Sequence, residues 1–156
     1  MNRSVLKEKS KAFALRIIRM AEYIQSSKRE FVLTKQILRS GTSIGANVHE
    51  AFFGQSLPDF ISKLSIARKE CGETQYWLEL LNESGKISDE EFKSINEDCE
   101  EVGRLLTASI KTAIKTLNIR KKVESEPSVA HEPILVYDKK SDEKDDTEEL
   151  LTHYSL

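Results

Sequence analysis

The chain has 156 residues, of which 32% are charged and 38% hydrophobic, with six glycines and three prolines. This length is enough for one domain with a real core and an extension, and the composition is typical of a helical protein. No run approaches the roughly 18 apolar residues that span a bilayer. The first ten residues carry charges where a signal peptide has its apolar segment. We therefore expect a cytoplasmic protein.

Charge is distributed in blocks along the chain. Residues 1–47 hold ten Lys or Arg against three acidic residues, residues 70–101 hold two against eleven, and residues 102–122 hold six against none. Alternating blocks of this kind favour packing between helices or subunits of opposite charge, and they allow a local basic surface. The net charge of −2 therefore says little about partners.

Four stretches carry the periodicity of amphipathic helices. The predicted helices cover residues 4–26, 33–54, 56–82 and 88–119. Ser56, followed by a proline and an aspartate, has the pattern of a helix start, and Gly85 fits a helix end. Ser88 and Glu91 form a capping box for the fourth helix. Short connections between long helices predict an all-α, antiparallel up-down-up-down four-helix bundle.

The composition changes after residue 120. Residues 121–156 hold five basic and ten acidic side chains and few apolar ones, as expected of disorder. Two apolar islands, residues 133–137 and 150–156, could dock a partner or fold back onto the bundle. We therefore divide the chain into a bundle, residues 1–120, and an acidic, largely disordered tail, residues 121–156.

The second helix carries a polar row opposite its apolar stripe. On a helix of about 100° per residue, four polar side chains fall within roughly 80° of one another: Arg39, Ser43, Asn47 and Glu50. Arg39 and Glu50 are too far apart to bond directly, so each needs a partner outside its own helix. That favours contacts with an adjacent subunit, although a nucleic acid or water could also satisfy the row.

The third helix has a second apolar cluster on the side away from its core stripe. The cluster consists of Ile66, Tyr76, Trp77 and Leu80, and Trp77 is the one tryptophan of the sequence. A four-helix monomer has little use for such a face. We therefore interpret it as an interface between subunits.

The segment Arg39-Ser-x-x-Ser-Ile-x-x-Asn-x-x-Glu50, with Asp59-Phe60 and Glu73, resembles the family of the 23S rRNA intervening-sequence proteins. Relatives of that family include the accessory variability proteins of diversity-generating retroelements. The resemblance spans roughly residues 9–119, and its motif positions are Arg39, Ser40, Ser43, Ile44, Asn47 and Glu50. It implies a four-helix bundle that assembles into a ring-like homopentamer, with no known enzymatic activity. The retroelement relatives bind a reverse transcriptase and nucleic acid.

No stretch has the pattern of a catalytic or metal site. The P-loop, HExxH and GxSxG motifs and Cys/His metal spacings are absent from the sequence. His49 and Glu50 are adjacent, so their side chains point about 100° apart on a helix. Cys71 and Cys99 fall on core stripes, where we expect buried, reduced thiols. We therefore predict a protein that is not an enzyme and that holds no cofactor or metal.

Two basic surfaces are candidates for binding nucleic acid. The first helix presents Lys9, Arg16, Arg19 and Tyr23 away from its core stripe, and the end of the fourth adds Lys111 and Lys115. Lysine and arginine contact phosphates, and a tyrosine stacks on a base. The alternative is that these cations pair with the acidic block, residues 70–101, in the same or a neighbouring subunit.

Taken together, these patterns predict a homo-oligomer, in the form of a pentamer, that binds RNA, DNA or a nucleic-acid-processing protein. The alternative function is a protein-interaction scaffold without nucleic-acid binding, whose acidic tail recruits a partner.

Overall fold

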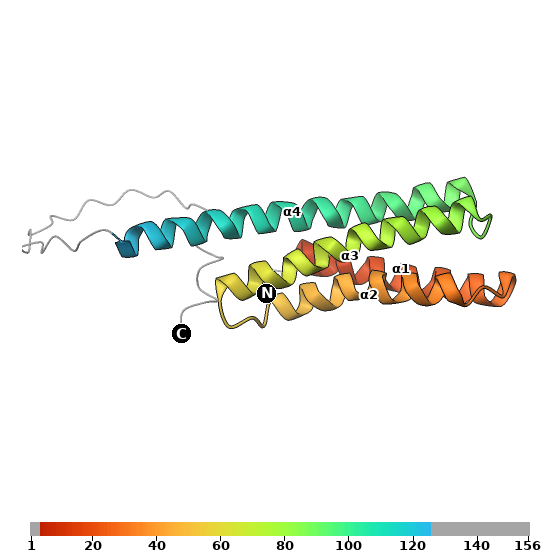
Figure 1. The fold of residues 1–156 in the computed structure, drawn as a ribbon, viewed down its shortest axis with the longest axis horizontal. Helices are drawn as coiled ribbons and strands as arrows, with labels where there is room; N and C mark the ends of the chain where they lie inside the picture. The colour runs from red at the N-terminus through yellow and green to blue at the C-terminus, as the bar shows by residue number, and fades with distance from the viewer. Residues whose placement is uncertain (1–3, 126–156) are drawn as a thin grey trace, which may run out of the picture.

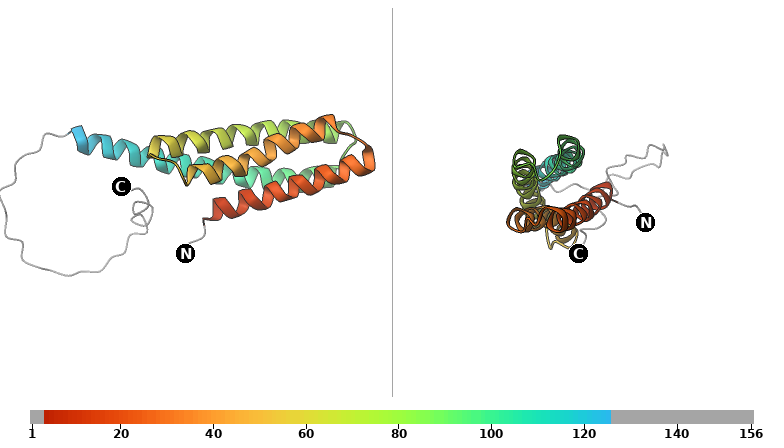
Figure 2. Two further views of the ribbon diagram at one scale, coloured as in Figure 1. Left: turned by 90° about the horizontal axis from the view of Figure 1, so that it is seen from below. Right: turned by 90° about the vertical axis from the view of Figure 1, so that its right-hand side faces the viewer.

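The computed structural model describes residues 4–125. These residues form four helices: α1 (Val5–Lys28), α2 (Val32–Ala51), α3 (Leu57–Glu83) and α4 (Asp89–Ser125). Successive helices run antiparallel, with α1 and α2 as one pair and α3 and α4 as the other (Figures 1 and 2). The described residues contain no strand. The predicted all-α, up-down-up-down four-helix bundle is confirmed.

The core lies along the facing stripes of all four helices. Its largest side chains with less than 2% exposure are Phe13, Ile17, Ile24, Ile37, Ile44, Leu64, Leu78, Leu81, Leu106, Val48, Val102 and Thr34. Burying one side chain of this size stabilises the fold by about 1.5–3 kcal/mol, so tertiary packing holds these helices together. The apolar stripes predicted from the periodicity are the stripes that the structure buries.

The predicted cap residues at both ends of α3 and at the start of α4 are confirmed. The Ser56 hydroxyl accepts a hydrogen bond from the Asp59 N–H at 3.2 Å, and Gly85 has φ 70° after the end of α3. At the start of α4, both hydrogen bonds of the predicted capping box form. The Glu91 N–H donates to the Ser88 hydroxyl at 3.2 Å, and the Ser88 N–H donates to the Glu91 carboxylate at 2.8 Å.

The start of α2 is fixed by a side chain that the sequence pattern did not single out. The Glu30 carboxylate accepts hydrogen bonds from the N–H groups of Val32, Leu33 and Thr34, each at 2.9 Å. Burial alone would raise the pKa of Glu30, but these backbone hydrogen bonds outweigh it and lower the pKa. Glu30 therefore satisfies three of the N–H groups that a helix start leaves without partners.

Helix α4 continues to Ser125, past the boundary predicted at residue 120, and extends beyond the ends of its neighbours (Figure 1). No proline interrupts it before Pro127, and Lys122 in its last turn interacts favourably with the negative end of the helix dipole. The predictions for the rest of the tail fall on residues 126–156, which lie outside the described residues. None of the four described helices combines the length and apolar character needed to cross a membrane.

Candidate functional site

Two members of the polar row on α2 form ion pairs with α3 of the same chain. Arg39 pairs with Glu73, and the same Glu73 oxygen accepts a hydrogen bond from the indole N–H of Trp77 at 3.1 Å. At the C-terminal end of α2, Glu50 pairs with Lys63 at 2.5 Å. We call these contacts, with the hydroxyl pair described next, the α2–α3 clamp.

The hydroxyl pair lies inside the bundle and is formed by the residues that directly follow Arg39 and Glu73 in the sequence. Ser40 and Thr74 are completely buried, and their hydroxyl oxygens lie 3.0 Å apart. The Thr74 hydroxyl is also 2.7 Å from the carbonyl oxygen of Glu70, which accepts its proton. A buried hydroxyl needs such a partner, because leaving it unpaired costs about 1–3 kcal/mol. These two positions therefore fix the register of α2 against α3.

The remaining motif positions of α2 serve the helix itself or the core. The Asn47 side chain donates to the carbonyl of Ser43 at 2.9 Å, one turn earlier on the same helix, and Ile44 is completely buried. Next to them, Gly41 packs against α1, where an added Cβ would lie 2.9 Å from a side-chain carbon of Ile17. The absence of a side chain at Gly41 therefore allows α1 and α2 to approach closely.

These contacts correct the inference drawn for Arg39 and Glu50. Each does find its partner outside α2, as expected, but the partner is on α3 of the same chain and no second subunit is needed. Sequence spacing shows which residues share a face, but it does not show which helix packs against that face. The signal that could have identified the pairs was Glu73, a motif position whose charge is opposite to that of Arg39.

Trp77 is also more enclosed than the sequence suggested. It is half-buried, packs against the edge of the core, and meets Tyr76 edge-on with ring centroids 5.1 Å apart. Ile66 and Tyr76 of the same predicted apolar face are exposed. The face therefore persists, but Trp77 is partly satisfied within one chain, and its role in a subunit interface stays a prediction.

The basic face of α1 is partly neutralised by α4. Lys9 pairs with Glu101 at 3.0 Å, and Arg16 pairs with Asp98 at 2.6 Å. The Arg16 guanidinium also donates to the Ser94 hydroxyl at 2.6 Å and to the Ser94 carbonyl at 3.0 Å. For these two cations, pairing with the acidic block in the same chain is therefore the interpretation that the structure supports. Arg19 and Tyr23 are exposed on the same helix.

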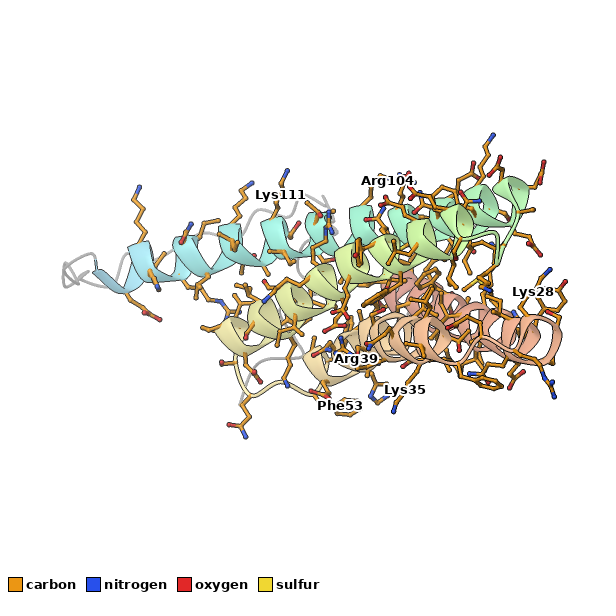
Figure 3. The ribbon with its side chains drawn as sticks, turned by 45° about the vertical axis from the view of Figure 1, so that its right-hand side comes forward. Lys28, Lys35, Arg39, Phe53, Arg104 and Lys111 are labelled. Atoms are coloured by element: carbon orange, nitrogen blue, oxygen red, sulfur yellow. The ribbon has the colours of Figure 1, made fainter. Side chains whose placement is uncertain are left out.

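The end of α4 has a different character. Arg104, Lys111, Lys115 and Lys122 are spaced so that they fall within roughly 40° on the helix, and all four are exposed. We call them the α4 basic stripe. In Figure 3, Arg104 and Lys111 project to the same side of α4. Arg104 lies 3.6 Å from Glu100, one turn earlier. Lys111 and Lys115, predicted from the sequence, therefore belong to a longer surface.

A groove runs beside the α4 basic stripe, between α3 and α4. It has a volume of about 430 Å³, and its charged and amide lining residues are Arg68, Gln75, Glu100, Arg104 and Lys111. The Arg68 guanidinium crosses over α4 at Gly103, where an added Cβ would lie 3.9 Å from it. Three cations from two helices therefore line one concave surface. Sequence reasoning missed Arg68 because helical periodicity does not relate positions on different helices.

The two cysteines meet at the inner wall of this groove as free, buried thiols, as predicted. The Cys99 thiol donates to the carbonyl of Cys71 at 3.6 Å. Its hydrogen bond with the Cys71 sulfur and its burial raise the pKa of Cys99, so it stays protonated and unreactive. Among residues 4–125, no three His, Cys, Asp or Glu side chains gather closely enough to hold a metal ion.

The described chain is thus a four-helix bundle whose polar motif joins α2 to α3 and whose last helix carries a basic surface. Residues 3–108 match the model of the 23S rRNA-intervening sequence protein family, and the chain belongs to this family. The bundle is also similar to the crystal structure of a protein of unknown function from the S23 ribosomal protein family of Bacteroides thetaiotaomicron. The two chains are 52% identical with a TM-score of 0.68, over 69% of this chain and 99% of that one. A comparison with curated proteins finds no match.

Proposed function

We propose that this protein is a non-enzymatic, homo-oligomeric bundle that binds nucleic acid, in the form of structured RNA, through the α4 basic stripe and the adjoining groove. The observation that carries the proposal is the basic character of residues 102–122, which hold six basic side chains and no acidic one. On α1, Lys9 and Arg16 pair with carboxylates of α4 at 3.0 and 2.6 Å, whereas on the stripe Arg104 lies 3.6 Å from Glu100 of its own helix. The α4 basic stripe is therefore the stronger candidate for contacting phosphates.

The geometry of the groove suits a phosphate backbone. Arg68 and Arg104 can donate two hydrogen bonds each to a phosphate, and Lys111 adds a point charge beside them. Because the stripe repeats along several turns of α4, successive cations can follow successive phosphates. Basic contacts of this kind bind without reading the sequence, so we expect RNA shape to matter more than base identity.

Oligomerisation is part of the proposal. On α4, Ile114, Ile119 and Val123 are 41%, 55% and 68% exposed, which is apolar surface that another subunit can cover. The resemblance implies a homopentamer, and a ring would repeat the α4 basic stripe in each subunit. A weak contact repeated in this way becomes a strong one by avidity. We place this assembly in the cytoplasm, where RNA is available.

The same exposed apolar side chains favour a second candidate function. A protein partner, such as a nucleic-acid-processing enzyme, could dock on the end of α4 without any contact between this chain and nucleic acid. The two functions differ in their response to salt. Phosphate contacts weaken steeply as ionic strength rises, whereas an apolar docking surface changes little.

The test is a titration of fluorescently labelled structured RNA with the full chain at about 50 and 200 mM salt. We expect binding in the micromolar range or tighter at low salt, and marked weakening at high salt. The double variant Lys111→Gln/Lys115→Gln should lower the affinity. It should also reduce the slope of log K against log salt by roughly one for each lysine that contacts a phosphate.

The matched control is Lys28→Gln/Lys35→Gln, which removes the same charge from exposed positions on α1 and α2, away from the groove (Figure 3). It should leave the affinity and the slope nearly unchanged. Equal losses in both double variants would show that only net charge matters. No binding at low salt would reject the nucleic-acid function and favour the protein partner.

A further inference from the structure

The turn after α2 leaves a large aromatic ring in solvent. Phe53 is 72% exposed, although its neighbour Phe52 is half-buried and packs edge-on against Phe60 with ring centroids 5.6 Å apart. Phe52 thus anchors the turn to the bundle, while Phe53 contributes little to the core. An exposed aromatic ring of this size is a candidate contact surface for a ligand.

Basic groups surround this ring. The His49 ring lies against Phe53 with centroids 5.0 Å apart and planes inclined by 39°. The Lys7 ammonium reaches from α1 and lies 4.7 Å from the Phe52 ring centroid and 5.7 Å from that of Phe53. Two helices that are distant in sequence therefore bring one exposed ring and two basic side chains to one place.

A groove between α1 and α2 adjoins these side chains. It has a volume of about 240 Å³ and is lined by Lys7, Lys11 and His49, together with small or apolar residues. Of the described residues that line it, none is acidic. The helices approach closely at its base, because an added Cβ on Gly45 would lie 3.4 Å from the carbonyl oxygen of Ser10. The groove is thus a shallow, basic depression with an aromatic ring at its edge.

From this arrangement we infer that Phe53 and His49 form a stacking site for an unpaired base of single-stranded nucleic acid, with Lys7 and Lys11 contacting the flanking phosphates. This inference rests on the proposed function and adds a second, separate contact. Stacking on an aromatic side chain is tolerant of base identity, since every base has a π-face. The cations and the absence of acidic lining match a phosphate backbone in charge.

The site is separable from the α4 basic stripe. In Figure 3, Phe53 projects from one side of the molecule, and Lys111 projects from the other. A strand of about six nucleotides covers a single site of this kind. A short single strand therefore reports on Phe53, whereas a long structured RNA reports on the α4 basic stripe.

The experiment measures binding of a labelled oligoadenylate of about six nucleotides to the full chain at low salt. Phe53→Ala should raise Kd on the order of ten- to a hundredfold, and Phe53→Trp, which keeps a stacking surface, should retain binding. The matched control is Phe31→Ala, because Phe31 is 59% exposed at the opposite end of α2, and it should leave Kd unchanged. An abasic oligonucleotide of the same length should bind much more weakly.

Three outcomes would overturn the stacking site. The first is equal affinity of the Phe53→Ala variant and the unaltered chain, and the second is equal affinity for the abasic strand. The third is a lower oligomer mass of Phe53→Ala in sedimentation, which would assign Phe53 to a subunit contact. If the short strand does not bind while the long RNA still binds, the stacking site alone is rejected. If neither the short strand nor the long RNA binds, the proposed function is rejected as well.

Discussion

The α2–α3 clamp and the far end of α4 are built on opposite principles. In the clamp, polar side chains meet partners in the same chain: Arg39 meets Glu73, Glu50 meets Lys63, and Ser40 meets Thr74. At the end of α4, basic and apolar side chains both remain exposed. The first region uses its polar groups to fix the fold. The second carries the surface that we propose for a partner.

The family match separates the same two regions. It ends at residue 108, so it includes the whole clamp and excludes Lys111, Lys115 and the last turns of α4. The segment that is most characteristic of the family therefore serves the framework in this chain. Of the surface that we propose for nucleic acid, most of the groove lies within the matched residues, and Lys111, Lys115 and Lys122 of the α4 basic stripe lie outside them. On this proposal, the motif that identifies the family serves the fold, and the site of function lies elsewhere.

The largest predicted difference in stability is between a variant in the core and a variant in the last turns of α4. Ile44→Ala removes a completely buried side chain beside the clamp and should destabilise the chain by about 2–5 kcal/mol. Ile119→Ala, on a residue that is 55% exposed on α4, should change stability by about 0.5 kcal/mol or less. Urea denaturation followed by circular dichroism measures both. A comparable loss in the two variants would show that the end of α4 is covered by another subunit.

The second contrast compares two helix-interior glycines. Gly41→Ala should destabilise by about 1–3 kcal/mol, because its new Cβ would meet the completely buried Ile17 side chain at 2.9 Å. Gly72→Ala, on α3, meets no atom within 4 Å and should stabilise by up to about 1 kcal/mol. Thermal unfolding of both variants tests the signs. A stable Gly41→Ala variant would mean that α1 and α2 can separate without cost.

The third prediction concerns pH and the start of α2. Glu30 has a folded-state pKa below its usual value of 4.5, so its contribution to stability is present above that pH. It is lost as the pH falls from about 4.5 through the lowered pKa. Glu30→Gln should therefore cost about 1 kcal/mol at neutral pH and much less near pH 3. Urea unfolding of both proteins at the two pH values measures this, and a pH-independent difference would contradict the carboxylate's role.

The smallest effect is expected at the exposed ion pair of the clamp. Arg39 is 57% exposed in its side chain, so Arg39→Ala should cost less than about 1 kcal/mol. A double-mutant cycle with Glu73→Ala isolates the pair energy from other losses. Sedimentation of the same variants sharpens the comparison. A lower assembly mass for Arg39→Ala would assign Arg39 to a subunit contact in addition to its pair with Glu73.

Sequence reasoning succeeded where the determining interactions are local. Caps at Ser56, Ser88 and Gly85 follow from backbone geometry within one turn, and the buried stripes follow from periodicity. It failed where a residue's partner is on another helix. Lys9, Arg16 and Arg39 each had several possible acidic partners in the sequence, and only packing selected one.

By itself, the sequence determined the class of fold, the caps at Ser56, Gly85 and Ser88, the core stripes and the family. These features depend on the order of apolar and polar residues and on short-range hydrogen bonds. Tertiary structure alone decided that Arg39 faces Glu73, that Arg68 joins Lys111 in one groove, and that Lys7 approaches Phe53. Such contacts depend on the register between packed helices, and no periodicity within a single helix contains that information.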